Sequence, residues 1–266
     1  MPVWKRWRKS EIKLPLESTA DKKRSADIGE KLLMKPIAVF RHSPAEGAGY
    51  FATFLARHSL PWTLFTIDTG VLPPPTSDDF SGLCFMGGPM SVNDDLPWVA
   101  PALNLIRDAD SKGIPVLGHC LGGQLMSKAF GGVVTKNPVK EIGWGRVEFI
   151  DDQAAVWAGD TLTFDAFHWH GETFSLPPDA IHILRSAHCE NQAFVRGVHL
   201  GMQCHVEMTE AMIRLWGKHW DDESVAASAS VQTPQQIYSE METKIQAMRQ
   251  VADQLYSQWI RGLKME

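Results

Sequence analysis

One cysteine between glycines is better placed for chemistry than any other residue of this sequence. Residues 118–124 read Gly-His-Cys-Leu-Gly-Gly-Gln and follow an apolar, strand-like run, and a helix is predicted to begin just after Cys120. A nucleophile between glycines at a strand-to-helix turn is typical of a nucleophile elbow. The N-terminus of the helix favours the thiolate, which is the reactive form. The motif predicts that Cys120 is a catalytic nucleophile, although a buried structural cysteine stays open as an alternative.

A histidine and a glutamate follow a strand predicted over residues 198–204. His205 and Glu207 are two residues apart, and such residues point to the same side of an extended chain. Glu207 can therefore orient one nitrogen of the His205 ring, while the other nitrogen accepts the proton of Cys120. This pattern predicts a Cys-His-Glu triad.

A glycine-rich turn, Gly87-Gly88-Pro89, closes a strand predicted over residues 83–86. Backbone N–H groups in such a turn can stabilise a developing oxyanion, and the N–H of Leu121 is the natural second donor. A phosphate-binding loop is excluded because the sequence contains no G-x-x-x-x-G-K-[ST] motif. A plain tight turn remains the alternative.

Together these motifs resemble the class I glutamine amidotransferase family, in particular the glutaminase unit of GMP synthetase. The resemblance covers residues 36–207 and rests on five segments in the order of the family: 87–89, 118–124, 141–144, 168–172 and 205–207. It implies a catalytic triad of Cys120, His205 and Glu207 and oxyanion donors at Gly88 and Leu121. It also implies substrate contacts from Gln124, Gly87, His170 and Glu172.

The sequence departs from the family pattern at four positions, one of which is Trp169, in place of a family serine. Val206 stands between His205 and Glu207 where the family commonly has proline, which leaves the two-residue spacing intact. Glu172 replaces a family aspartate that lies near the α-amino group of the substrate, and it is one methylene longer. Cys204 replaces an aromatic residue; we interpret it as a packing residue, with a redox role as the alternative.

The order of predicted elements indicates an α/β fold. Strands are predicted over 37–40, 62–67, 83–86 and 114–118, with helices over 48–58 and 98–111 between them. This alternation predicts an open, mostly parallel twisted sheet flanked by helices, and the family likeness implies the flavodoxin-like arrangement. Later segments predict short strands over 146–150, 162–167, 181–185, 192–195 and 198–204, then helices over 209–219 and 234–262. Sites in such sheets lie beyond the carboxyl ends of the strands, where Gly88 and Cys120 fall.

Length, charge and composition predict the domain boundaries and argue against several classes of protein. We expect a basic N-terminal extension over residues 1–34 and a single domain over 35–266. The whole chain has a net charge of −5, which argues against a nucleic-acid-binding domain. No apolar run reaches the roughly 20 residues that span a bilayer, so no membrane partner is expected. Without a signal peptide or a C-x-x-C pair, the sequence favours a cytoplasmic protein with reduced thiols.

Two further histidines have a spacing that could suit a metal ion. His168 and His170 also lie two residues apart, but no third ligand is placed near them by a recognisable spacing. The sequence therefore predicts neither a metal site nor a cofactor.

The expected activity is cysteine-dependent hydrolysis of the γ-amide of glutamine through a γ-glutamyl thioester, with ammonia passed to a separate synthetase. Two alternatives stay open. Residues after Glu207 contain no ATP-binding loop, which favours a free-standing γ-glutamyl peptide hydrolase. A non-catalytic binding or regulatory module of the same fold is the second alternative, because a fold alone does not establish an activity.

Overall fold

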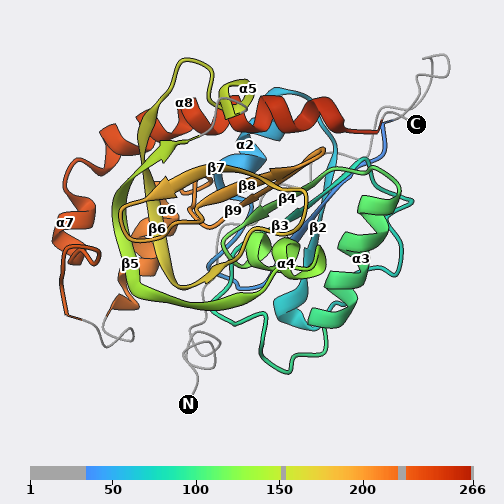
Figure 1. The fold of residues 1–266 in the computed structure, drawn as a ribbon, viewed down its shortest axis with the longest axis horizontal. Coiled ribbons are helices and arrows are strands. Elements are labelled where there is room, and N and C mark those ends of the chain that lie inside the picture. Colours follow the sequence, from blue (N-terminus) through green and yellow to red (C-terminus); the bar gives the residue numbers. More distant parts are fainter. Residues whose placement is uncertain (1–33, 151–153, 221–225, 265–266) are drawn as a thin grey trace, which may run out of the picture.

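A computed structural model of the chain describes residues 34–150, 154–220 and 226–264 (Figure 1). The predicted basic extension lies outside these residues, apart from Met34. Nine strands in the described part form one sheet with the order β2-β1-β3-β4-β9-β8-β7-β5-β6. Within the described residues, no helix is both long enough and apolar enough to cross a membrane.

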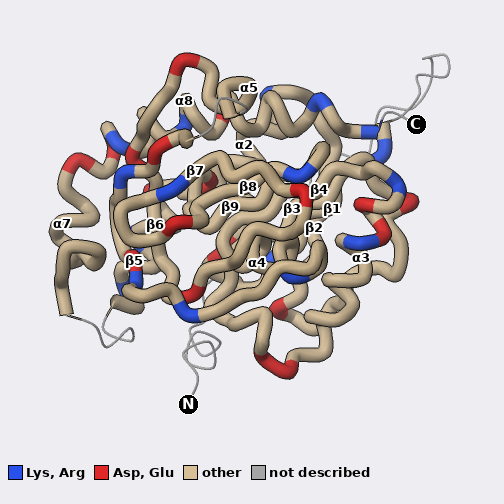
Figure 2. The backbone as a smooth tube through the Cα atoms, in the orientation of Figure 1, with Lys and Arg blue, Asp and Glu red and all other residues tan. Residues whose placement is uncertain are grey.

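The first half of the sheet is parallel, as the sequence predicts. Its strands are β1 (Ile37–Arg41), β2 (Trp62–Thr66), β3 (Gly82–Phe85), β4 (Val116–His119) and β9 (His199–Met202), and neighbours among them pair in parallel. Helices α2 (Gly49–Arg57) and α3 (Val99–Ser111) are the crossovers, and α4 (Leu121–Ala129) follows β4. The strands at the centre of this half carry no charged side chain (Figure 2), which is typical of strands covered on both faces.

The second half of the sheet is antiparallel. It contains β5 (Val134–Phe149), β6 (Thr163–Phe174), β7 (Ile181–Ser186) and β8 (Ala193–Arg196), and β8 joins it to β9. Figure 1 shows β5 and β6 as long curved strands. The strand predicted over 146–150 is only the end of β5. The earlier part of β5 shows no apolar run because it contains exposed polar residues and shifts register between Lys136 and Glu141.

Side chains of the parallel strands alternate between two hydrophobic cores. In β1, Ile37 and Val39 pack with α2, α6 (Glu210–Gly217) and α8 (Met241–Trp259), whereas Ala38 and Phe40 pack with α3 and α4. Successive residues of a strand point to opposite faces, so helices cover both sides of the sheet. The fold is therefore the predicted sheet between two helical layers.

The C-terminal helix predicted over 234–262 is interrupted. It consists of α7 (Pro234–Tyr238), α8 and a 3-10 turn η4 (Ile260–Gly262). The break lies at an extended Ser239 and at Glu240, whose φ of 58° is left-handed. The buried residues of α8 pack into the core on one face of the sheet. Two short elements complete the described fold: η1 (Ile67–Thr69) and α5 (Ala155–Ala158).

The carboxyl ends of β1, β3, β4 and β9 meet at one edge of the sheet, because these strands are parallel neighbours. The segments that leave this edge are 42–46, 86–90, Cys120 and 203–207. The topology thus brings together the motifs that the sequence analysis identified.

Candidate active site

Cys120 occupies a sharp turn between β4 and α4. Its φ of 49° and ψ of −105° lie where residues with a side chain are uncommon. The turn is anchored on both sides: the Cys120 N–H donates to the Met202 carbonyl at 2.8 Å, and the Gln124 N–H donates to the Cys120 carbonyl at 3.0 Å. Such a conformation persists only where the surrounding structure fixes it.

The flanking glycines allow strand and helix to approach each other at this turn. A Cβ atom added to Gly122 would lie 2.0 Å from the Phe85 carbonyl oxygen, and one added to Gly118 would lie 2.5 Å from the Gly122 carbonyl carbon. No larger residue fits at either position without a backbone shift. The turn thus has the geometry of a nucleophile elbow, for the reason that the sequence indicated.

His205 and Glu207 form a buried pair beside this turn. Glu207 Oε1 lies 2.7 Å from His205 Nδ1, and both side chains are buried. Backbone bonds to Phe167 on β6 fix the main chain of His205, whose N–H donates to the Phe167 carbonyl at 2.8 Å. Trp216 packs edge-on against the ring at 5.0 Å between centroids. Cys120 is close enough to raise the pKa of this ring, and His205 Nε2 has no hydrogen-bond partner among the described residues. The three proposed triad residues are therefore neighbours.

The electrostatics of the pair favour its ionised form. Burial by itself would raise the pKa of Glu207, but His119 and His205 lower that pKa to about 2. Burial would likewise lower the pKa of His205, yet Glu207 and Cys120 raise it well above its usual range. A carboxylate next to the ring stabilises the imidazolium that forms when a cysteine thiol transfers its proton to His205.

A second buried layer lies behind the triad. The His119 Nε2 lies 2.9 Å from the Tyr256 hydroxyl of α8. The same nitrogen is 3.8 Å from Glu207 Oε2, an oxygen with no hydrogen-bond partner among the described residues. Helix α8 thus contacts the triad through His119. No sequence motif pointed to Tyr256.

The two predicted oxyanion donors belong to adjacent segments. A Cβ atom added to Gly88 would lie 2.6 Å from Leu121 Cδ2. Leu121 is the first residue of α4, so its N–H has no acceptor within the helix. Backbone N–H groups of this kind can stabilise an oxyanion beside the preceding nucleophile.

Cys120 lines a cavity of about 770 Å³. Six of the predicted site residues line it: Cys120, His205, Gly88, Gln124, His170 and Glu172. Glu207 lies behind His205, while Gly87 and Leu121 lie against lining residues. The cavity is therefore walled by both halves of the sheet.

Gln124 reaches the nucleophile through a residue that the sequence analysis missed. Its Nε2 donates to Gln203 Oε1 at 3.1 Å, and Gln203 Nε2 donates to Cys120 Sγ at 3.5 Å. Both amides are buried. Gln203 lies two residues before His205 at the end of the strand predicted over 198–204, and this position was a signal that could have identified it.

Glu46 is a second residue that sequence reasoning missed. It lines the cavity with only 5% of its surface exposed. A Cβ atom added to Gly87 would lie 2.2 Å from Glu46 Oε2 and 3.1 Å from His205 Cε1, which places this carboxyl beside the triad. Burial raises the pKa of Glu46 to about 8, although His205 opposes the shift. Glu46 lies in a loop after β1 that contains no recognisable motif.

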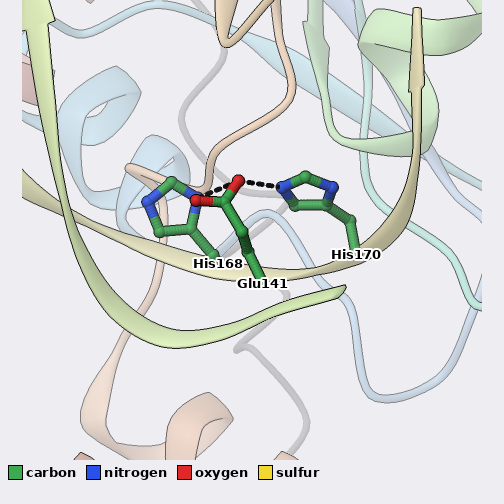
Figure 3. Close-up of side chains that lie close together, drawn as sticks. All are labelled: Glu141, His168 and His170. Carbon is green, nitrogen blue, oxygen red and sulfur yellow. Dashed lines mark hydrogen bonds and ion pairs between the residues drawn. The ribbon is translucent and has the colours of Figure 1, made fainter. Parts of the chain in front are cut away.

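His170 and Glu172 lie on the β6 wall of the cavity. The Glu172 carboxylate accepts a hydrogen bond from Ser91 Oγ at 3.1 Å. His170 Nε2 lies 3.0 Å from Glu141 Oε2, and His168 Nδ1 lies 4.0 Å from the same oxygen (Figure 3). Glu141 is directly opposite His170 in the β5–β6 register. The strand pairing therefore supplies a third potential ligand that the spacing in sequence did not reveal.

The four cysteines are free thiols and all are buried. Cys204 belongs to the hydrophobic core on the α8 side of the sheet, which agrees with its interpretation as a packing residue. Burial raises the pKa of the Cys189 thiol to about 11.

Comparison with known proteins gives one family. The glutamine amidotransferase class-I family model matches residues 56–213. The glutamine amidotransferase-like protein YfeJ of Salmonella typhimurium is 29% identical over 178 residues, which cover 63% of this chain and 74% of that protein. A glutamine-hydrolyzing GMP synthase subunit of Ignicoccus hospitalis is 31% identical over 140 residues, covering 52% of this chain and 72% of the relative.

A solved structure agrees with these relatives over more of the chain. The crystal structure of a glutamine amidotransferase from Methylobacillus flagellatus has 43% sequence identity and a TM-score of 0.85, and the match covers 88% of this chain and 97% of that one. A glutamine amidotransferase from Thermotoga maritima shares the fold, with a TM-score of 0.75 at 24% identity over 85% of this chain and 97% of that one. The chain belongs to the class I glutamine amidotransferase family.

Proposed function

We propose that the protein hydrolyses the γ-amide of glutamine, or of a close γ-glutamyl relative, through a covalent thioester on Cys120. One observation supports this above the others. Cys120 stands on a strained elbow at the wall of a cavity and interacts with His205, whose far nitrogen lies 2.7 Å from Glu207. Nucleophile, base and orienting acid are thus arranged in series.

The first half of the proposed reaction forms the thioester. The Cys120 thiolate attacks the γ-carbonyl carbon, and the carbonyl electrons move to oxygen. The N–H groups of Gly88 and Leu121 stabilise this oxyanion. As the intermediate collapses, His205 donates its proton to the leaving nitrogen and the C–N bond breaks, which releases ammonia or an amine.

The second half regenerates the enzyme. The neutral His205 accepts a proton from water, and the resulting hydroxide attacks the thioester carbon. The C–S bond then breaks, which gives glutamate and returns the thiolate beside the protonated His205. Glu207 holds the ring in one orientation through both halves and remains a carboxylate.

Substrate recognition is assigned to the walls around Cys120. We assign the α-amino group of the γ-glutamyl unit to Glu172, with His170 on the same strand and Gln124 and Gly87 closer to the nucleophile. Glu172 is already oriented by Ser91, which supports a fixed position for its carboxylate.

The size of the cavity supports a second candidate for the leaving group. Pockets that hold drug-sized ligands measure about 300–1,000 Å³, and this one measures about 770 Å³. Such a volume favours γ-glutamyl peptides, with an amine as leaving group, in addition to glutamine. If glutamine is the substrate, the ammonia passes to a separate synthetase, because the Ignicoccus hospitalis relative is named as one subunit of a GMP synthase.

A substrate panel separates these possibilities. Purified protein is incubated with glutamine and with γ-glutamyl dipeptides, and glutamate release is measured for the wild type and for Cys120→Ala. We expect release by the wild type and none by the variant. Turnover of dipeptides with glutamine untouched would exclude the ammonia-donor function. Equal trace release by both proteins would leave only a non-catalytic module of this fold.

A further inference from the structure

Three buried side chains with metal-ligating atoms converge on the β5–β6 hairpin, apart from the triad. They are Glu141 on β5 and His168 and His170 on β6 (Figure 3). One atom from each lies within 4.8 Å of the other two. The proposed thioester chemistry assigns no step to this cluster.

Each histidine ring has an outer nitrogen turned away from Glu141 and an inner nitrogen that faces it. The hydrogen bond of the outer nitrogen determines whether the inner nitrogen carries a hydrogen. His170 Nδ1 lies 3.0 Å from the Glu172 carbonyl, and His168 Nε2 lies 3.3 Å from the Gly145 carbonyl. A carbonyl oxygen only accepts, so each of these outer nitrogens must carry the hydrogen. In a neutral ring the inner nitrogen is then a lone pair. Both lone pairs face the Glu141 carboxylate.

The two lone pairs and the carboxylate face one another, so a positive group between them would stabilise the arrangement. A hydrogen on His170 Nε2 can bridge its 3.0 Å contact with Glu141. His168 Nδ1 lies 4.0 Å from the same oxygen, which is too far for a hydrogen bond, and its donor among the described residues is Gln192 Nε2 at 3.5 Å. A metal ion satisfies all three groups together, since each ligand atom then binds the ion instead of its neighbour.

The groups around the cluster resemble the supporting contacts of metal sites. Histidine ligands usually donate their other N–H to a carbonyl or carboxylate, and ligating carboxylates are themselves hydrogen-bonded. Here Glu141 accepts from Ser186 Oγ at 2.8 Å and from Gln192 Nε2 at 2.7 Å. Gln192 is fully buried, and its Oε1 has no hydrogen-bond partner in the described part of the chain.

We propose that Glu141, His168 and His170 bind a divalent transition-metal ion, with Zn²⁺ as the ion that best fits the ligands. Two imidazoles and one carboxylate are a known zinc ligand set, completed by one further oxygen. The hard ions Mg²⁺ and Ca²⁺ prefer oxygen ligands alone and do not match two ring nitrogens.

A cavity beside the cluster gives an ion access to it, and a bound ion would affect the pairing of β5 and β6. A second cavity of about 220 Å³ is lined by Glu141, His168 and Ser186, which gives an ion a route to the cluster. The bound ion links β5 to β6 beside the register shift between Lys136 and Glu141. It therefore stabilises the strands that carry His170 and Glu172 of the cavity wall, without entering the thioester chemistry.

The test measures metal binding to the untagged full-length protein. Zn²⁺ is titrated against a competing chelator, bound metal is counted after dialysis, and Co²⁺ serves as a spectroscopic probe. We expect about one ion per chain and a Tm that rises with Zn²⁺. His168→Asn and Glu141→Gln should each bind at least about tenfold more weakly. His58→Ala removes an exposed histidine at the end of α2 and should bind as the wild type does.

Two results would overturn the proposal. One is the absence of Zn²⁺ binding by folded wild type. The other is equal binding by the wild type and His168→Asn, which would place the ion elsewhere. If Glu141→Gln fails to fold, His168→Asn decides the question, because it leaves the 3.0 Å contact between Glu141 and His170 in place. These readouts do not depend on glutamine turnover, so failure of the proposed function would leave them interpretable.

Discussion

Glu207 keeps a negative charge at a position where burial alone would favour its neutral form. Its pKa falls to about 2 because His119 and His205 outweigh the desolvation that would raise it. Glu46, beside the same histidine, has a pKa of about 8, since burial dominates there. Two neighbouring carboxyls are thus held in different protonation states by their surroundings, which is typical of sites that carry out acid–base chemistry.

The charge of Glu207, more than its shape, should matter for catalysis. Glu207→Gln keeps the side-chain size but removes the charge that stabilises the His205 imidazolium. We expect kcat to fall by roughly 10²–10⁴-fold, with a native circular dichroism spectrum. Steady-state glutamate release measures this. Unchanged kcat in a folded variant would contradict the role given to Glu207.

Glu46 should make the protein less stable as the pH rises. Its pKa is about 8 in the folded chain against an ordinary value of 4.5, so between these values the unfolded chain loses a proton that the folded chain keeps. The contribution of Glu46 to stability is therefore most favourable below the unfolded pKa and declines up to about pH 8. Relative to wild type, Glu46→Gln should gain up to about 1.4 kcal/mol per pH unit across this window.

Urea unfolding at several pH values tests this prediction. The exposed Glu190→Gln is the matched control and should follow the wild type throughout. A constant difference between Glu46→Gln and the wild type would show that Glu46 does not stay protonated in the folded chain.

At the scale of elements, the elbow depends on close contact between α4 and the ends of β3 and β9. Gly122→Ala places a methyl group 2.0 Å from the Phe85 carbonyl, so the helix must shift. We expect a loss of at least about 2 kcal/mol of unfolding free energy and loss of turnover. Gly47→Ala, where no described atom lies within 4 Å of the added Cβ, should change neither. Equal thermal melting of both variants would contradict this account of the elbow.

Helix α8 should influence the triad through one hydroxyl. Tyr256→Phe removes the 2.9 Å contact with His119, which lies against Glu207. We expect a loss of about 1–2 kcal/mol of stability and a changed pH profile of kcat/KM. Tyr50→Phe is the control, because its hydroxyl contacts Asp253 of the same helix at 2.8 Å but lies away from the triad. A pH profile changed equally in both variants would show that α8 acts through stability alone.

The elements differ in how far the sequence could predict them. The parallel strands and the elbow were predictable because short apolar runs and closely spaced glycines are local signals. The length of β5 was not, since its first half is polar and shifts register at Glu141. The convergence of Glu141 with His168 and His170 depends on that pairing. The sequence also could not predict the break between α7 and α8, because glutamate is not a residue that usually adopts the left-handed conformation found at Glu240.

At the scale of the molecule, two halves of one sheet share the site. The parallel half supplies Cys120, Gly88 and Glu46, and the antiparallel hairpin supplies His170 and Glu172. His205 follows β9 and pairs through its backbone with Phe167 on β6, so it joins the halves. The sequence motifs predicted most of these residues, but Glu46 became apparent only when the loops were placed together.

The central claim concerns a bond on one sulfur atom. Wild-type protein is mixed with glutamine or a γ-glutamyl dipeptide, quenched in acid within the first turnovers, digested and analysed by mass spectrometry. We expect a γ-glutamyl group on the peptide that contains Cys120, and none on the peptides of Cys84, Cys189 or Cys204. Glutamate release without any adduct on Cys120, or release that persists in Cys120→Ala, would contradict it.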